Sequence, residues 1–305
     1  MPLNSTRGAG SAKGFGLTSA IKLAAWVAAP AISGLTYDNY TPAGGKSSAI
    51  ATGGFNGGNA TTQSSATRFN GTSWSSIPNM PYDTFQHGTS GDGSSAIVFG
   101  GAVRPPEGLQ GASASWNGTS WSGTPAIPTA RRELQGRNGS TPAVINVGGN
   151  PDGGGGGTTT AVIKYNGSSW SSAPNYPIPI RGNGVSGDSS NAISYGGDNS
   201  AGTYYTNSYS FNGSAWSATP GLSSTRSVYN GFGPSSNAMT AGGYNGSINL
   251  ATTESFNGTS WATAPSIPNA KSYTTAGSSA AGSFTDGGAY LITGSLTDPT
   301  YFWTK

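Results

Sequence analysis

Four basic side chains occupy corresponding places in an internal repeat, and they are the residues best suited to bind a charged ligand. Each follows a tryptophan–proline pair: Arg131, Arg181, Arg226 and Lys271. Rotational symmetry among the repeats would arrange them around one ring, where their charges could bind an anionic glycan or a carboxylate of a partner protein. The alternative is that each side chain hydrogen-bonds the carbonyl groups of neighbouring loops.

Other reactive groups are scarce. The chain has no cysteine and one histidine, His87, which excludes thiolate chemistry and any metal site with two histidine ligands. The 11 acidic residues are scattered, so no carboxylate pair of a glycosidase is indicated. Gly-Gly-Lys-Ser at 44–47 resembles the end of a phosphate-binding loop, but Tyr40 stands where its first glycine is required. We therefore expect no catalytic residue, no metal and no cofactor, in a protein that is not an enzyme.

Charged residues make up only 8% of the 305 residues, and the net charge is +3. The sequence contains no lysine- and arginine-rich run of the kind that binds nucleic acid. It also contains no apolar run near the ~20 residues that cross a bilayer, and no secretory signal. We expect no nucleic-acid or membrane partner, and synthesis in a cytoplasm without export. Aromatic residues, at 10%, are too frequent for a disordered chain.

The internal repeat spans 45 to 49 residues, measured between successive tryptophans. Six tryptophans each have a proline four residues later: Trp26, Trp74, Trp121, Trp170, Trp216 and Trp261. Six Gly-Gly pairs recur with the same period and begin at Gly53, Gly100, Gly148, Gly196, Gly242 and Gly287. An aromatic residue followed by Asn-Gly stands five residues before five of these tryptophans. Because several kinds of residue recur independently with the same period, the sequence indicates a repeat architecture.

The Asn-Gly pairs predict tight β-hairpins, because a type I′ turn needs positive φ at both central residues. With Asn70 and Gly71 as such a turn, Thr67 pairs with Trp74, and Phe69 and Trp74 become diagonal neighbours on one face. Most Asn-Gly pairs also begin glycosylation sequons, which the turns alone explain. Short apolar runs that end in Gly-Gly indicate further strands, so each unit holds about four strands.

A four-stranded unit repeated at this length is typical of one blade of a β-propeller. A single sheet with an aromatic face cannot bury that face alone, so we expect the tryptophans to pack between neighbouring blades. The order aromatic residue, Trp, Pro, basic residue, Ala-Ile and Gly-Gly resembles the kelch repeat over residues 18–303. The sequence differs from the kelch repeat in its uniform Asn-Gly turn. It differs also at Thr36 and Thr84, which replace the basic residue in two units.

We predict an all-β fold, a six-bladed kelch-like β-propeller of four-stranded antiparallel blades over residues 19–305. A short irregular arm, residues 1–18, precedes it. A ring must pair its two ends, so a strand near residues 20–27 should complete the blade built from the C-terminal residues. Whether residues 299–305 add a strand stays open. Loop aromatic residues that could stack on sugars are Tyr37, Tyr40, Tyr82, Phe85, Tyr176 and Tyr229.

The arm contains small residues, two cations, Arg7 and Lys13, and one aromatic residue, Phe15. Residues 7–16 resemble the start of structural proteins in tailed bacteriophages from marine and environmental sources. The resemblance implies a non-enzymatic component of the virion, present in multiple copies, that docks to other virion proteins through residues 1–18. The propeller would then serve as a decoration, fibre or host-adhesion module, with a host-surface glycan as a further partner. A free carbohydrate-binding propeller and a sialidase-like enzyme stay open as alternatives.

Overall fold

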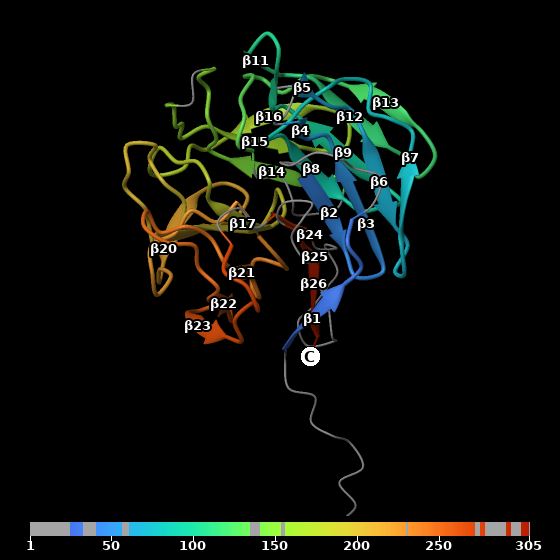
Figure 1. Ribbon diagram of the computed structural model, residues 1–305. Helices are drawn as coiled ribbons and strands as arrows, with labels where there is room; N and C mark the ends of the chain where they lie inside the picture. Colours follow the sequence, from blue (N-terminus) through green and yellow to red (C-terminus); the bar gives the residue numbers. More distant parts are fainter. Residues whose placement is uncertain are drawn as a thin grey trace, which may run out of the picture.

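The computed structural model describes residues 25–32, 41–56, 61–134, 141–153, 156–229, 231–271, 275–277, 291–293 and 300–304. Within these ranges every regular element is a β-strand, and the strands form a β-propeller (Figure 1). None of the described segments is a helix that is long and apolar enough to cross a membrane. The expectation of an all-β propeller is therefore confirmed.

Five sheets of three or four antiparallel strands form the blades that are recognised in the described residues. Blade 1 contains β2 (Thr41–Gly45), β3 (Ser48–Thr52), β6 (Ala66–Phe69) and β7 (Trp74–Ile77). Blade 2 contains β8 (Gly88–Gly91), β9 (Ala96–Phe99), β12 (Ser113–Trp116) and β13 (Trp121–Thr124). Blade 3 contains β14 (Val144–Val147), β15 (Val162–Tyr165) and β16 (Trp170–Ala173).

Blade 4 contains β17 (Gly184–Gly187), β18 (Ala192–Tyr195), β19 (Ser208–Phe211) and β20 (Trp216–Thr219). Blade 5 contains β21 (Met239–Ala241), β22 (Thr253–Phe256) and β23 (Trp261–Ala264). Two short hairpins extend from the loops of blades 1 and 2. They pair β4 (Phe55–Asn56) with β5 (Thr61–Thr62), and β10 (Ala102–Val103) with β11 (Gly108–Leu109).

A further four-stranded sheet combines both ends of the chain. Its order is β1 (Ala25–Ala29), β26 (Thr300–Thr304), β25 (Leu291–Thr293) and β24 (Thr275–Gly277). Trp26 lies opposite Trp303 in the antiparallel pairing of β1 with β26, and Figure 1 shows β1 beside the C-terminus. The expected pairing of the two chain ends is thus observed, and the open question of the last residues is answered by β26. We call these four strands the closing sheet.

The core lies between the sheets and is built from aromatic rings. In each of the five blades, the aromatic residue that ends the next-to-last strand packs on the tryptophan that begins the last strand, as in Phe69–Trp74 with ring centroids 5.2 Å apart. The same tryptophans also reach the preceding blade, because Trp170 lies 4.6 Å from Phe99 and Trp261 lies 4.5 Å from Tyr195. Such pairs bury large apolar areas and favour tilted or edge-on geometry. The expected packing of tryptophans between blades is confirmed.

The Asn-Gly turns differ from the predicted type I′ hairpins. Phe69 lies directly opposite Trp74 in the β6–β7 pairing, so four residues form the loop. Asn70 Oδ1 accepts the backbone N–H of Ser73 at 2.9 Å, and within the loop only Gly71 has a positive φ, of 95°. The predicted register was wrong because the asparagine side chain closes a longer loop than a two-residue turn allows. The same arrangement recurs at Asn117, Asn166, Asn212 and Asn257.

Closure of the ring can be tested at Trp26. Its ring contacts Trp303 edge-on at 5.1 Å, and its Nε1 donates a hydrogen bond to Pro265 O at 3.0 Å. Trp26→Ala should lower the free energy of unfolding by about 3–5 kcal/mol, because it empties a buried site between the closing sheet and blade 5. Chemical denaturation of the whole chain measures this loss. The neighbour Val27 is 46% exposed, so Val27→Ala should change stability by less than ~0.5 kcal/mol. Equal effects of the two substitutions would contradict this role of Trp26.

Candidate functional site

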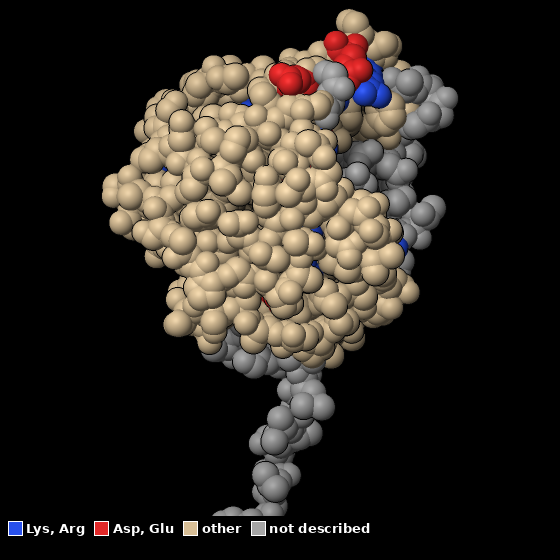
Figure 2. Space-filling view, turned by 90° about the vertical axis from the view of Figure 1, so that its left-hand side faces the viewer, with Lys and Arg blue, Asp and Glu red and all other residues tan. Residues whose placement is uncertain are grey.

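Charged side chains gather at one end of the propeller. Figure 2 shows acidic and basic atoms together at one edge of the visible face, whereas the rest of that face carries almost no charge. At this end lie the described Gly-Gly pairs, each directly after a strand, and the connection from the preceding blade passes beside each of the later pairs. We call this end the Gly-Gly face. Its loops include the hairpin of β10 and β11.

Backbone hydrogen bonds fix which residues of the connections are equivalent. The second glycine of each of the five described pairs donates its N–H to one connection carbonyl, at 2.7–3.0 Å. The accepting residues are Thr84, Arg131, Ile180, Arg226 and Lys271. Arg181 stands one position later and corresponds to Arg132, because these two pair with Asp198 and Asn150 respectively. Arg181 was therefore placed wrongly in the predicted series of cations. It stands seven residues after its proline, and Ile180 occupies the position that is six residues after the proline in every connection.

Two of the four predicted ligand-binding cations lie inside the protein. Arg131 is 1% exposed and Arg226 is 0% exposed. Arg226 donates to Gly242 O at 3.1 Å and to Thr252 O at 3.0 Å, and forms an ion pair with Glu254 at 2.6 Å. Burial lowers the pKa of Arg226, and the charge of Glu254 opposes that effect. Both arginines therefore contact the neighbouring blade, and a ring of four accessible cations is not formed.

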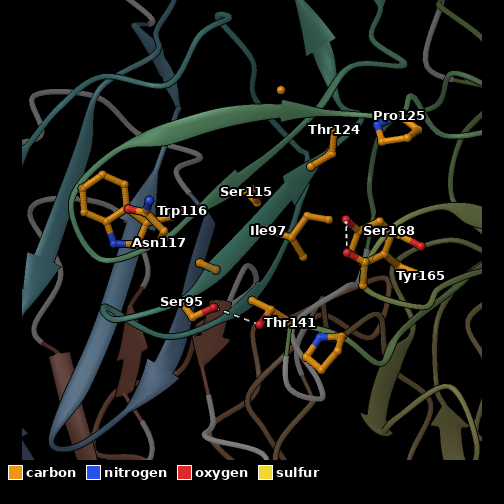
Figure 3. Close-up of a pocket in the computed structure, with 14 residues that line it drawn as sticks. Ser95, Ile97, Ser115, Trp116, Asn117, Thr124, Pro125, Thr141, Tyr165 and Ser168 are labelled. Carbon is orange, nitrogen blue, oxygen red and sulfur yellow. Dashed lines mark hydrogen bonds between the residues drawn. The ribbon is translucent and has the colours of Figure 1, made fainter.

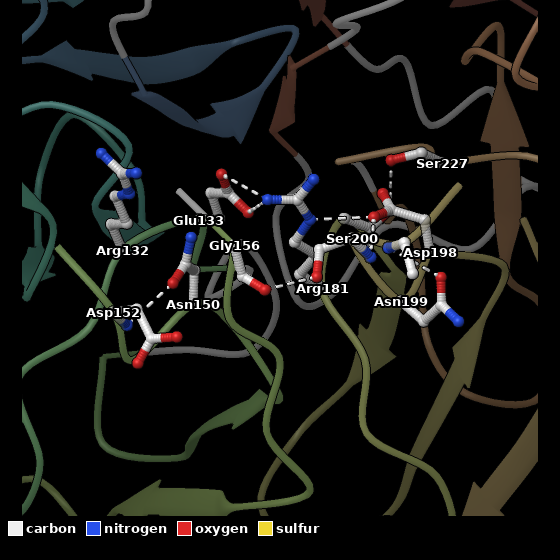
Figure 4. A network of polar contacts seen from close by, with 12 residues as sticks. Arg132, Glu133, Asn150, Asp152, Gly156, Arg181, Asp198, Asn199, Ser200 and Ser227 are labelled. Carbon is white, nitrogen blue, oxygen red and sulfur yellow. Dashed lines mark hydrogen bonds and ion pairs between the residues drawn. The ribbon is translucent and has the colours of Figure 1, made fainter. Parts of the chain in front are cut away.

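The third cation, Arg181, belongs to a polar network on the Gly-Gly face (Figure 4). Its guanidinium lies between Asp198, at 2.8 Å, and Glu133, at 3.3 Å. Glu133 is 8% exposed and has a φ of 57°, so its backbone is held in the left-handed region. Desolvation raises the pKa of Glu133, while Arg181 and Arg132 act in the opposite direction. A cation held between two carboxylates is already neutralised and has little capacity for an anionic ligand.

The remaining predicted residues contribute in different ways. Lys271 is half-buried, and its backbone pairs with Gly243 and Leu250. The expected docking residues Arg7, Lys13 and Phe15 lie outside the described residues. Of the loop aromatic residues, Tyr37 and Tyr40 also lie outside them. Phe85 and Tyr176 are buried in the core and so are not free to stack on a sugar.

A groove of about 470 Å³ opens between blades 2 and 3. Ser95 and Thr141 face each other across it and their hydroxyl groups are 2.9 Å apart, as Figure 3 shows. Its lining carries no charged side chain and includes Ser95, Thr124, Thr141 and Ser168 together with Trp116 and Tyr165. A smaller hollow of about 180 Å³ lies between blades 4 and 5 and is lined by Asn191, which precedes β18 as Ser95 precedes β9. A groove of hydroxyl groups fits a neutral polyhydroxyl ligand better than an ionic one.

In the part of the chain that the structure describes, no group of three or more histidine or acidic side chains is placed to hold a metal ion. His87 is buried, and its Nε2 lies 2.8 Å from Thr52 Oγ1. Glu254 was not identified from the sequence. The feature that could have identified it is an acidic residue two positions before the Phe-Asn-Gly of its repeat.

No protein-family model matches the chain, and a search of the curated proteins also finds no match.

The buried ion pair between blades 4 and 5 gives a stability prediction. Glu254→Ala should reduce the free energy of unfolding by about 3–5 kcal/mol, because it leaves the fully buried Arg226 without a counter-charge. Thermal denaturation would measure the loss. Asp83→Ala, which removes an exposed carboxylate that forms no ion pair with a described residue, should leave the melting temperature unchanged and serves as the control. A Glu254 variant as stable as the Asp83 variant would show that the pair has no structural role.

Proposed function

We propose that the chain is a non-enzymatic component of a tailed-phage virion, docked through residues 1–18 and presenting its propeller as a decoration, fibre or host-adhesion module. The observation that carries the proposal is the sequence of residues 7–16, together with the place where the propeller begins. β1 is the outermost strand of the closing sheet. The described part of the chain therefore begins on an outer strand of the propeller, at Ala25.

The finer architecture belongs to the same proposal. We take the closing sheet as the sixth blade, which makes the protein a six-bladed propeller of the kelch type. The six Gly-Gly pairs of the sequence support this count, as does the four-stranded order of the closing sheet. In a propeller the sheet edges that remain open are the short outer strands of the blades, which suits a protein that is presented in many copies without aggregating.

The distribution of charge also supports a structural and binding role. The arginines with the least exposure, Arg131 and Arg226, join neighbouring blades, and Arg181 lies between two carboxylates. The outer strands expose mainly serine, threonine and alanine, as in β20 and β23. Such a surface offers hydroxyl groups for recognition and few ionic groups for catalysis.

The docking arm can be tested by incorporation into particles. A variant with Arg7→Ala, Lys13→Ala and Phe15→Ala should be at least about tenfold depleted from purified virions, because it removes the two charges and the one ring available for docking. Mass spectrometry of particles that carry tagged protein measures this ratio. Arg104→Ala, a charge change on the Gly-Gly face, should be incorporated normally. Normal incorporation of the arm variant, or absence of the wild-type protein from particles, would contradict the proposal.

A second candidate function is carbohydrate binding, and the groove between blades 2 and 3 favours it. Its hydroxyl groups can exchange hydrogen bonds with those of a neutral sugar, whereas Trp116 and Tyr165 are buried and form only the floor of the groove. Carbohydrate binding is compatible with the virion role if the ligand is a host-surface glycan.

Ser168 offers a matched test of the groove. Ser168 and Ser214 occupy equivalent turns, and each donates its hydroxyl hydrogen bond to the asparagine two residues earlier. Only Ser168 is among the residues that line the groove. Ser168→Arg should weaken binding of neutral oligosaccharides at least about tenfold in calorimetry, because a long cation would fill the groove, while Ser214→Arg should not. Unchanged binding in the Ser168 variant would place any sugar site elsewhere.

A further inference from the structure

Arg131 and Arg226 are equivalent residues in two different interfaces between blades. Arg226 Nη1 donates to Thr252 O at 3.0 Å, and Arg131 Nη1 donates to Ala161 O at 3.3 Å. Each of these carbonyl oxygens also accepts the N–H of the first glycine in its Gly-Gly pair, Gly242 and Gly148 respectively, at 3.0 Å. The two guanidinium groups therefore enter their interfaces in the same way.

The two interfaces differ in what the rest of the guanidinium meets. Arg226 Nη2 lies 2.6 Å from Glu254 Oε1 and 2.7 Å from Ser224 Oγ. Glu254 stands opposite Thr240 in its sheet, and Ile163 holds the same place opposite Asn146 in blade 3. No carboxylate is thus supplied at that place in the interface of blades 2 and 3.

Three polar groups in the interface of blades 2 and 3 lack a hydrogen-bond partner among the described residues. They are Arg131 Nε, Arg131 Nη2 and the side-chain amide of Asn146, of which both the oxygen and the nitrogen are unpaired. Arg131 is 1% exposed and Asn146 is 0% exposed, so bulk water does not reach them.

Strand alternation shows that Asn146 faces the same interface as Arg131. Ile145 and Val147 pack with residues of blade 4, whereas Val144 packs with Phe99 and Ile97 of blade 2. Side chains two residues apart share a face of a strand, so Asn146 points with Val144 toward blade 2. The guanidinium of Arg131 and the side-chain amide of Asn146 therefore both lie between blades 2 and 3.

The surroundings of Arg131 make an unpaired charge costly. The interface of blades 2 and 3 is otherwise apolar and includes Ile127, Leu134, Val144 and Ile163. Desolvation lowers the pKa of Arg131 to about 10, so the group remains charged at neutral pH. A buried cation of this kind requires a counter-charge.

We propose that a small monovalent anion of the size of chloride binds between blades 2 and 3. It would be held by Arg131 Nη2, the counterpart of the Arg226 atom that meets Glu254, and by the amide nitrogen of Asn146. The anion occupies the place that the Glu254 carboxylate takes between blades 4 and 5. It balances the charge of Arg131 and joins the two blades, a structural role that is independent of the virion proposal.

The test is the dependence of stability on the identity of the anion. Thermal and chemical unfolding of the whole chain is measured in sodium chloride and in sodium gluconate at equal ionic strength, since gluconate is too large for the site. Chloride should lower the unfolding equilibrium constant by the factor 1 + [Cl⁻]/Kd, which is about tenfold at about nine times Kd. An equal stability in the two salts would overturn the proposal.

Two variants separate the site from general salt effects. Ile163→Glu supplies the missing carboxylate and should abolish the chloride dependence. Arg131→Met removes the charge within an apolar interface and should abolish it as well, which keeps the test valid if the first variant fails to fold. Glu254→Ile is the matched control, because it should create a chloride dependence in the interface of blades 4 and 5. Chloride dependence that survives in both the Ile163 and the Arg131 variants would overturn the proposal.

A crystal grown with bromide gives the location directly. An anomalous peak within hydrogen-bond distance of the Arg131 guanidinium is expected in the wild type and should be absent in Arg131→Met. Bromide peaks confined to the surface would contradict a buried site.

Discussion

The packing of each sheet against the next is the interaction on which this protein depends. A blade of four short strands has two faces to bury, and neither can be buried within the blade itself. Tryptophans such as Trp170 and Trp261 therefore pack on rings of the preceding blade. Ring closure removes the two exposed faces that a linear stack would leave. The pairing of β1 with β26 thus affects every blade, because it completes the last pair of interfaces.

The interfaces between blades also contain several of the few charged side chains. At one repeat position, successive blade connections place a threonine, an arginine, an isoleucine, a second arginine and a lysine beside the Gly-Gly pair of the neighbouring blade. Thr84 reaches Gly100 O with its hydroxyl group, and Arg226 reaches across with a guanidinium that Glu254 neutralises. On the face that Figure 2 shows, the surface away from the Gly-Gly face carries little charge. This arrangement leaves hydroxyl-lined grooves as the main features of the outer surface that could select a ligand.

Much of the fold was predictable from the sequence, because repeated tryptophans, prolines and Gly-Gly pairs report directly on strands, turns and interfaces. The pairing of the chain ends was also predictable, since a ring needs it. The hairpin register was not predicted correctly, because the side chain of Asn70 accepts backbone N–H groups and stabilises a four-residue loop. Arg181 was assigned to the wrong repeat position because Ile180, and not a basic residue, stands six residues after Pro174. Glu254 escaped notice because a buried counter-charge depends on which face of β22 meets the next arginine.

The most direct test of a closed ring is hydrogen exchange of backbone amides in the native chain. If the blades and the closing sheet form one cooperative unit, amides of β1 and β26 should be protected to the same free energy as those of β18 in the middle of the chain. Rapid exchange in β1 and β26, with full protection retained in β18, would contradict ring closure and leave an open stack of blades.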